Sequence, residues 1–410
     1  MSASSTVTDV SDFGIESSIP IQSTTASQVR TNRHRTDSLH VLHIVNGEHF
    51  AGAERVQSHL GRCLPDLGVR ADFVCVKPGR FADMLDQRDG TQEHWGHCHR
   101  IPMRRRWDRS CVNKLIDIVE KERVHLLHAH TPRTAMISSA TSDITGIPWI
   151  YHLHSPASRD GYQWIRNRIN AWVEQRSLRN VLHQIAVSSS LKSDITAGGV
   201  DPDSVTVVFN GVPAIRPPRE SRPIVGGPWT LGMIALMRPR KGLEIAIDAI
   251  ADLEARGVDV NLRCIGPFET DAYRRQIDAR IRDRQIGHRI EWLGFTNDVP
   301  SELSRLDAMV LPSLYGEGLP MVVLESMAAG TPVIATRVEG TPEAVQHGVE
   351  GLLAEPNDAG SLAEQIECLV TGQVDWTRMS EAAVKRHAAS FSDRTMATQT
   401  AEVYRRVLQS

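Results

Sequence analysis

The chain has 410 residues, a formal net charge of -3 at pH 7 and a pI near 6.6. That length exceeds what one hydrophobic core usually organises, so we expect two domains, each with an interior of its own. The near-neutral charge excludes a global attraction to nucleic acid or to a membrane, so any such contact must come from a local patch.

The six cysteines are scattered, without the short pair spacings of a zinc site or a disulfide framework. No apolar run reaches the length that spans a bilayer, and the first residues lack the charged start and apolar stretch of a secretory signal. We therefore expect a reduced, cytoplasmic protein, either soluble or held peripherally at the inner face of the membrane.

Residues 1–37 are rich in Ser and Thr and show no sustained periodicity, which predicts a disordered leader. Residues 40–45 (HVLHIV) are then followed by a glycine-containing loop and a helical pattern, which predicts a strand, a turn and a helix in succession. Further buried strands are predicted at 71–76, 125–130, 149–154, 183–188 and 205–210. Strands that alternate with helices in this way predict an α/β domain with a parallel sheet covered on both faces.

Prolines and glycines crowd the stretch before Trp229, and a second series of strands and helices begins at that residue. Ligands of open parallel sheets bind at the carboxyl ends of strands, so two such domains predict a central cleft lined by strand-end loops. The predicted division is a leader (1–37), a Rossmann-like domain (38–215), a hinge linker (216–228), a second Rossmann-like domain (229–390) and a C-terminal helix (391–410).

Two glutamates, Glu317 and Glu325, stand eight positions apart around a turn that leads into a helix at Pro320. The turn presents free backbone amides, and its glycines let a ligand approach the chain closely. A carboxylate accepts two hydrogen bonds from a vicinal diol, so the pair suits sugar hydroxyls. The alternative is that Glu317 is a solvated turn residue and Glu325 a surface residue of the helix. Glu325 argues against it, because the apolar run PMVVLESMAAG predicts a covered helix in which a carboxylate needs partners.

Three cations, Arg238, Arg240 and Lys241, precede the helix predicted at 242–257. A helix N-terminus carries partial positive charge, so each cation there is unfavourable by about 0.3–1 kcal/mol unless an anion joins it. The cluster predicts a phosphate site, and the alternative is a solvated basic turn.

The first domain offers weaker signals at its strand ends. The loop NGEHFAGAER places Gly52 where free amides face the cleft, although its glycine spacing is not GxGxxG. Two pairs of alternate histidines, His128 with His130 and His152 with His154, end apolar strands. Since cysteines and acidic residues at ligand spacing are missing, we predict no metal. His154 is expected to form hydrogen bonds in a sugar cleft, and His128 and His152 to be satisfied core histidines.

Other stretches favour ordinary structure. Asp201 and Asp203 lie beside a proline and predict a turn, and 93–100 (EHWGHCHR) is predicted to be a loop. The segment 162–180 combines tryptophans with arginines, so it predicts either a helix on an anionic membrane surface or a packed helix with a solvated basic face.

These residues resemble the retaining glycosyltransferases of family 4 (glycosyltransferase group 1), which have the GT-B fold of two Rossmann-like domains facing across a cleft. The resemblance runs from about His40 to the C-terminus. It rests on GEGLPMVVLESMAAGTPVIAT, on RPRKG, on the AGAE loop, on the strand ending in His154 and on FNGV (209–212).

The resemblance implies a metal-independent hexosyltransferase of EC 2.4 type with no cofactor, a nucleotide-diphosphate sugar as donor and a glycan or lipid-linked acceptor. Residues 38–215 would bind the acceptor and 229–390 the nucleotide sugar, and the last helix would return to the first domain and couple cleft closure to the hinge. We do not expect the protein to bind nucleic acid.

The resemblance also assigns roles to single residues. Glu317, with the amides of Gly318 and Leu319, would bind the donor sugar, and Glu325 would hold the nucleotide ribose. Lys241 and a nearby arginine would neutralise the leaving diphosphate. His154 would contact the donor sugar near the reacting carbon, and Gly52 and Asn210 would bind substrate. In the family an arginine often follows a glycine at the strand end, where this chain has Leu236; Arg238 is our choice to replace it, and Arg240 is the other candidate.

Three other functions fit the same residues. A nucleotide-sugar epimerase of the same fold would turn over the donor without an acceptor. A glycoside hydrolase would use Glu317 and Glu325 as acid and base, although their setting at a helix start beside a parallel sheet disfavours it. A catalytically silent sugar-nucleotide-binding protein would bind the donor without hydrolysing it.

Overall fold

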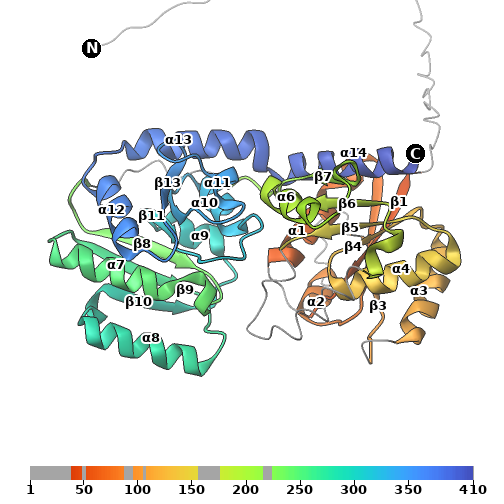
Figure 1. Ribbon diagram of the computed structural model, residues 1–410, viewed down its shortest axis with the longest axis horizontal. Coiled ribbons are helices and arrows are strands. Elements are labelled where there is room, and N and C mark those ends of the chain that lie inside the picture. Colours follow the sequence, from red (N-terminus) through yellow and green to blue (C-terminus); the bar gives the residue numbers. More distant parts are fainter. Residues whose placement is uncertain are drawn as a thin grey trace, which may run out of the picture. The chain divides into compact units, whose positions relative to one another are not determined.

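The computed structural model describes residues 38–48, 52–86, 96–104, 108–155, 176–215 and 224–409 (Figure 1). The predicted leader, most of the basic segment 162–180 and residues 216–223 of the predicted linker lie outside these ranges. The chain from Ser38 onward forms one compact unit. Among the described helices, none has the length and apolar character that crossing a bilayer requires.

The first sheet has seven parallel strands in the order β3-β2-β1-β4-β5-β6-β7. Its strands are β1 (Leu39–Val45), β2 (Val69–Cys75), β3 (Cys98–Arg100), β4 (Leu126–Ala129), β5 (Trp149–Leu153), β6 (His183–Ala186) and β7 (Val205–Val207). The helices between them are α1 (Gly52–Cys63), α2 (Arg80–Asp86), α3 (Arg109–Glu122), α4 (Pro132–Thr145) and α6 (Ser189–Ala197). The prediction of a loop at 93–100 was wrong for its last residues, because Cys98–Arg100 pair with β2 as an edge strand.

The second sheet has six parallel strands in the order β10-β9-β8-β11-β12-β13. Its strands are β8 (Trp229–Ile234), β9 (Val260–Ile265), β10 (Ile290–Gly294), β11 (Ala308–Leu311), β12 (Val333–Thr336) and β13 (Gly351–Ala354). The helices are α7 (Leu243–Ala255), α8 (Asp271–Arg284), α9 (Val299–Ser304), α10 (Met321–Ala329), α11 (Thr341–Ala344) and α12 (Ala359–Val370).

The central strands are buried on both faces, which is why they are continuous apolar runs without alternation. Along β11, Ala308 and Val310 join one apolar cluster, while Met309 and Leu311 join the other. Most residues of helix α10 are buried as well. Gly330 ends this helix in the left-handed conformation at φ 71°. The order of strands reverses beside β1 and beside β8, and at such a switch point the loops at the carboxyl ends diverge and leave room for a ligand.

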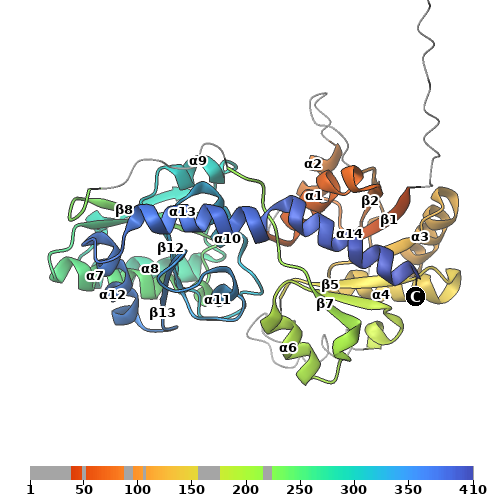
Figure 2. The ribbon, with the colours of Figure 1, turned by 90° about the horizontal axis from the view of Figure 1, so that it is seen from above.

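The C-terminal segment passes from the second domain to the first. Helix α13 (Trp376–Arg386) packs on α10, a short π-helical stretch (His387–Phe391) follows, and α14 (Asp393–Gln409) packs on α1 (Figure 2). Tyr404 of α14 is fully buried against the histidines of the first sheet. The last helix therefore belongs to the core of the N-terminal domain, although the chain reaches it last.

Candidate active site

The residues singled out by sequence lie at the carboxyl ends of the strands in both sheets. His154 follows β5, Gly52 begins α1, Lys241 lies in the turn after β8, and Glu317 lies between β11 and α10. Parallel strands bring their carboxyl ends to one edge of each sheet, so the loops of each domain gather at that edge.

Glu317 is a buried carboxylate with charged partners. Its Oε1 forms an ion pair with Nζ of Lys241 and accepts a hydrogen bond from the Ser313 hydroxyl at 2.6 Å. Burial acts to raise the pKa of Glu317, but Lys241, Ser313 and Arg240 outweigh it and hold that pKa below its ordinary value. Burial lowers the pKa of Lys241, and Glu317 opposes that effect. The pair is therefore a compact centre of opposite charges at the start of α10.

Glu325 is equally buried on α10, and its partner comes from the other domain. Oε1 of Glu325 forms an ion pair with Nη2 of Arg55 on α1. Burial raises the pKa of Glu325 and Arg55 lowers it, with burial the stronger effect. Sequence reasoning missed Arg55, although it follows directly on the AGAE loop that was singled out.

The arginine beside Glu317 is Arg240. Its Nη1 donates to the carbonyl of Gly316 at 2.9 Å and lies 3.9 Å from Glu317 Oε1. Nη1 of Arg238 instead lies 3.7 Å from Glu269 Oε1. Arg238 is nevertheless close enough to Lys241 to help lower the pKa of that lysine. The structure thus places Arg240 and Lys241 beside Glu317. Arg238, which we chose as the arginine of the phosphate site, lies at the edge of this cluster.

Backbone contacts join the two domains at the glycine turn. A Cβ added to Gly318 would lie 2.2 Å from the carbonyl oxygen of His154, so only glycine permits this approach. Nδ2 of Asn210 donates to the carbonyl of Leu319 at 3.0 Å. A Cβ added to Gly52 would lie 3.7 Å from Met321 Cγ, so the start of α1 faces the start of α10. Predicted residues from both domains therefore lie around one turn.

Two more glutamates that sequence reasoning missed complete this region. Glu339 has φ 45°, which is uncommon outside glycine, and its carboxylate accepts from the backbone N–H of Glu317. The carboxylate of Glu343 accepts from the backbone N–H groups of Ser189 and Ser190, both at 2.7 Å. Glu343 thus caps the N-terminus of α6 from the other domain, a favourable position for a negative charge. No local pattern marks either glutamate in the sequence.

The histidines at the ends of β1, β4 and β5 form one buried cluster. Nδ1 of His128 bonds the Tyr404 hydroxyl at 2.7 Å, whereas neither ring nitrogen of His152 has a partner among the described residues. The prediction of a satisfied histidine was therefore wrong for His152. Ligand atoms of His130, His152 and His154 lie within 4.8 Å of one another, as do those of His43, His128 and His130. The absence of a metal stays a prediction.

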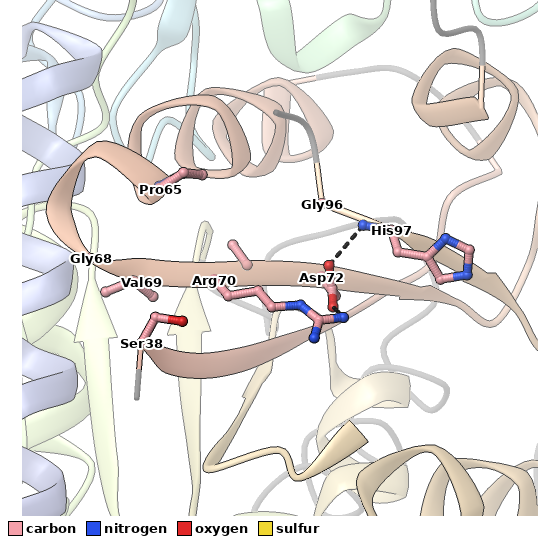
Figure 3. Close-up of a pocket in the computed structure, with 9 residues that line it drawn as sticks. Ser38, Pro65, Gly68, Val69, Arg70, Asp72, Gly96 and His97 are labelled. Carbon is pink, nitrogen blue, oxygen red and sulfur yellow. Dashed lines mark hydrogen bonds and ion pairs between the residues drawn. The ribbon is translucent and has the colours of Figure 1, made fainter. Parts of the chain in front are cut away.

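The turn predicted at Asp201 is confirmed, because its side chain accepts from the N–H of Asp203 and begins a short 3-10 helix. A pocket of about 410 Å³ lies elsewhere, at the amino ends of β1 and β2 (Figure 3). There His97 donates its backbone N–H to Asp72 at 2.7 Å, beside Arg70 and Ser38. This pocket is at the opposite edge of the first sheet from the predicted residues, so it is not part of the candidate site.

Comparisons with known protein families find matches in both domains. Residues 50–216 match Glycosyltransferase Family 4, and residues 216–386 match Glycosyl transferases group 1. The chain belongs to this glycosyltransferase family. The predicted family and the EC 2.4 transferase activity are thereby confirmed.

Relatives from several bacteria agree with this assignment. The alpha-maltose-1-phosphate synthase of Mycolicibacterium smegmatis is 30% identical over 323 residues, which cover 70% of this chain and 80% of the relative. An Escherichia coli UDP-Gal:alpha-D-GlcNAc-diphosphoundecaprenol alpha-1,3-galactosyltransferase is 25% identical over 76% of this chain and 83% of its own length. A putative colanic acid biosynthesis glycosyltransferase of Salmonella typhimurium is 35% identical, over 42% of this chain and 45% of its own.

Solved structures agree on the fold. The structure of Anabaena HepE in complex with UDP matches with a TM-score of 0.77 at 22% identity, over 89% of this chain and 99% of that one. With the seven- and six-stranded parallel sheets, this likeness confirms the predicted GT-B fold. Membership of this family supports transfer of a sugar group.

Proposed function

We propose that this glycosyltransferase is a retaining, metal-independent hexosyltransferase that takes its sugar from a nucleoside diphosphate sugar. The observation that carries the proposal is the buried centre of Glu317, Lys241 and Arg240 at the start of α10, with Glu325 on the same helix. Structures of Anabaena HepE in complex with UDP, with UDP and glucose, and with UDP-glucose support a uridine nucleotide as the first donor to test.

In this proposal the cationic side chains receive the diphosphate. Lys241 and Arg240 are fixed by Glu317 and by the Gly316 carbonyl, so their charges are in place before the substrate arrives. Charge grows on the diphosphate as the glycosidic bond breaks, and a preorganised cation stabilises it without reorganisation. Two fixed cations can supply this stabilisation, which is why no divalent metal is proposed. Arg238 is then an outer contributor to the positive potential.

The two glutamates bind the two ends of the donor. Glu317 accepts from the sugar hydroxyls beside the amides of Gly318 and Leu319, and Glu325 accepts from the ribose hydroxyls. Glu325 forms an ion pair with Arg55, so a ribose that bonds this carboxylate would replace the arginine as its partner. His154, Gly52 and Asn210 approach the turn from the N-terminal domain, where they would contact the donor sugar and the acceptor.

The acceptor is proposed to be a glycan or a lipid-linked glycan at the cytoplasmic face of a membrane. Support comes from the Escherichia coli relative, whose name specifies a diphosphoundecaprenol-linked acceptor. The proposed membrane contact is peripheral. It is tested by sedimentation with vesicles of anionic lipid at low and high salt, and recovery of all the protein in the supernatant at low salt would overturn it.

A ligand screen tests the donor. A nucleotide that binds the folded state stabilises it by RT ln(1 + [L]/Kd) and so raises the unfolding temperature more when its Kd is lower, which is why nucleoside diphosphates and their hexose derivatives are compared by thermal shift at one concentration. We expect one base to dominate, and the matching sugar nucleotide to be hydrolysed slowly without acceptor and transferred with retention in its presence. An inverted product anomer, seen by NMR, would overturn retention, and epimerised donor without transfer would favour the epimerase.

A further inference from the structure

Three histidines form a hydrogen-bonded file inside the first domain that ends at the predicted catalytic His154. Nδ1 of His43 on β1 lies 3.0 Å from Nε2 of His130, and Nδ1 of His130 lies 3.1 Å from Nε2 of His154. The rings of successive members are stacked, with centroids 5.3 and 5.4 Å apart. The file arises because His43 lies on β1 and because His130 and His154 directly follow β4 and β5, the next two strands of the sheet.

The other end of the file is closed by the C-terminal helix. The hydroxyl of Tyr404 on α14 lies 3.4 Å from Nε2 of His43 and 2.7 Å from Nδ1 of His128. Burial raises the pKa of the Tyr404 hydroxyl well above its ordinary value, so it keeps its proton. A single proton on that oxygen can be donated to one of the two histidines, and the oxygen then accepts from the other.

All members of the file are neutral imidazoles. Burial lowers the pKa of His43 to about 3 and that of His154 to about 4, and it lowers the pKa of His130 well below its ordinary value. A neutral imidazole has one N–H and one acceptor nitrogen. His130 therefore donates along one bond and accepts along the other, so the protons of the whole file must run in one direction.

His128 decides that direction. Its Nε2 is buried and has no partner among the described residues. If Tyr404 donated to Nδ1 of His128, the proton of that ring would lie on Nε2 as a buried N–H without an acceptor. Buried orphan N–H groups are rarer than unused acceptors because they forfeit a hydrogen bond that water would supply. His128 thus donates from Nδ1 to the tyrosine oxygen, and Tyr404 donates to His43.

We propose that this file holds His154 in the Nδ1–H tautomer, so that its remaining nitrogen offers a hydrogen-bond donor to an oxygen of the bound donor substrate. His43 donates from Nδ1 to His130, and His130 donates from Nδ1 to Nε2 of His154. His130 and Tyr404 are positioning residues, because they act through His154. The file also excludes His154 as a general base at Nδ1. The kinetic consequence rests on the proposed function, whereas the tautomer itself does not.

Nitrogen NMR of the full chain with ¹⁵N-labelled histidine tests the tautomer without any substrate. His154 is assigned by the signal lost in His154→Asn. We expect a protonated Nδ1 and an unprotonated Nε2 in the wild type, and loss of this signature in His130→Leu. His152→Leu is the matched control, because His152 is equally buried but bonds no member of the file. A protonated Nε2 of His154 in the wild type would overturn the proposal, whether or not the variants fold.

Steady-state kinetics test the consequence. Loss of one oriented hydrogen bond at the reacting sugar lowers kcat by about tenfold. We expect that fall in His130→Leu with the donor KM unchanged, and no fall in His152→Leu. An equal loss in both variants would mean that packing, and not the file, supports His154. Failure of the proposed function would instead leave the NMR signature intact while no sugar nucleotide is turned over.

Discussion

Replacing Lys241 with methionine removes the charge that faces Glu317 and keeps most of the apolar stem. The two side chains are only 14% and 6% exposed, so the carboxylate left behind is buried with the Ser313 hydroxyl as its remaining close donor. Removing one partner of a buried ion pair costs about 3–5 kcal/mol. Since Ser313 remains, we expect a loss near the lower end, about 3 kcal/mol, from the free energy of unfolding.

Urea denaturation at pH 7 measures that loss, with Lys114→Met on the exposed face of α3 as the control. Glu317→Gln in the same chain removes the stranded charge, so the double variant is expected to lose less stability than the sum of the two single variants. Transfer should fall by about 100- to 1000-fold in Lys241→Met, as for other lost oxyanion partners. Wild-type stability together with wild-type transfer in Lys241→Met would refute the reasoning.

The pH dependence of the same variant has a definite sign. In the wild type the pKa of Glu317 is lowered, so its stabilisation is present above the ordinary carboxyl pKa and is lost as the pH falls through the folded value. Without Lys241, only Ser313 and Arg240 oppose the effect of burial on Glu317, so its pKa lies higher than in the wild type, and protonation relieves part of the stranded charge at a higher pH. The stability difference between the wild type and Lys241→Met should therefore shrink as the pH is lowered from 7 toward 4. A constant difference would contradict the ion pair as its cause.

Glu325→Gln should weaken nucleotide binding in calorimetry, whereas Glu317→Gln should mainly lower kcat; equal and negligible effects of the two would remove their separate roles. Arg55→Ala should tighten nucleotide binding, because the ribose no longer displaces the arginine from Glu325; weaker binding would mean that Arg55 itself holds the nucleotide. Gly318→Ala should abolish transfer, since its Cβ would lie 2.2 Å from the His154 carbonyl, while Gly287→Ala, whose Cβ would make an ordinary 3.7 Å contact, should not. A chelator should leave transfer intact in a coupled assay, and strict recovery by added divalent metal would contradict a metal-free mechanism.

The sequence predicted the parts of this protein that depend on short-range pattern. Apolar runs broken by glycine turns indicated two βα series, because the periodicity of buried residues is set within each element. The apolar context of Glu325 similarly indicated a buried carboxylate, and it is 4% exposed. Hydrophobic periodicity extends over one element at a time, so these features could be predicted without knowing what each element packs against.

Only the tertiary structure decided which charges and hydrogen-bonding groups meet. Glu325 is paired with an arginine 270 positions earlier, and the Tyr404 hydroxyl lies on histidines of strands more than 270 positions earlier. Arg238 and Arg240 are two residues apart, yet a turn of 3-10 helix directs one toward Glu269 and the other toward Glu317. Such pairings depend on side-chain direction and on the packing of distant elements, to which a local pattern of residue types is insensitive.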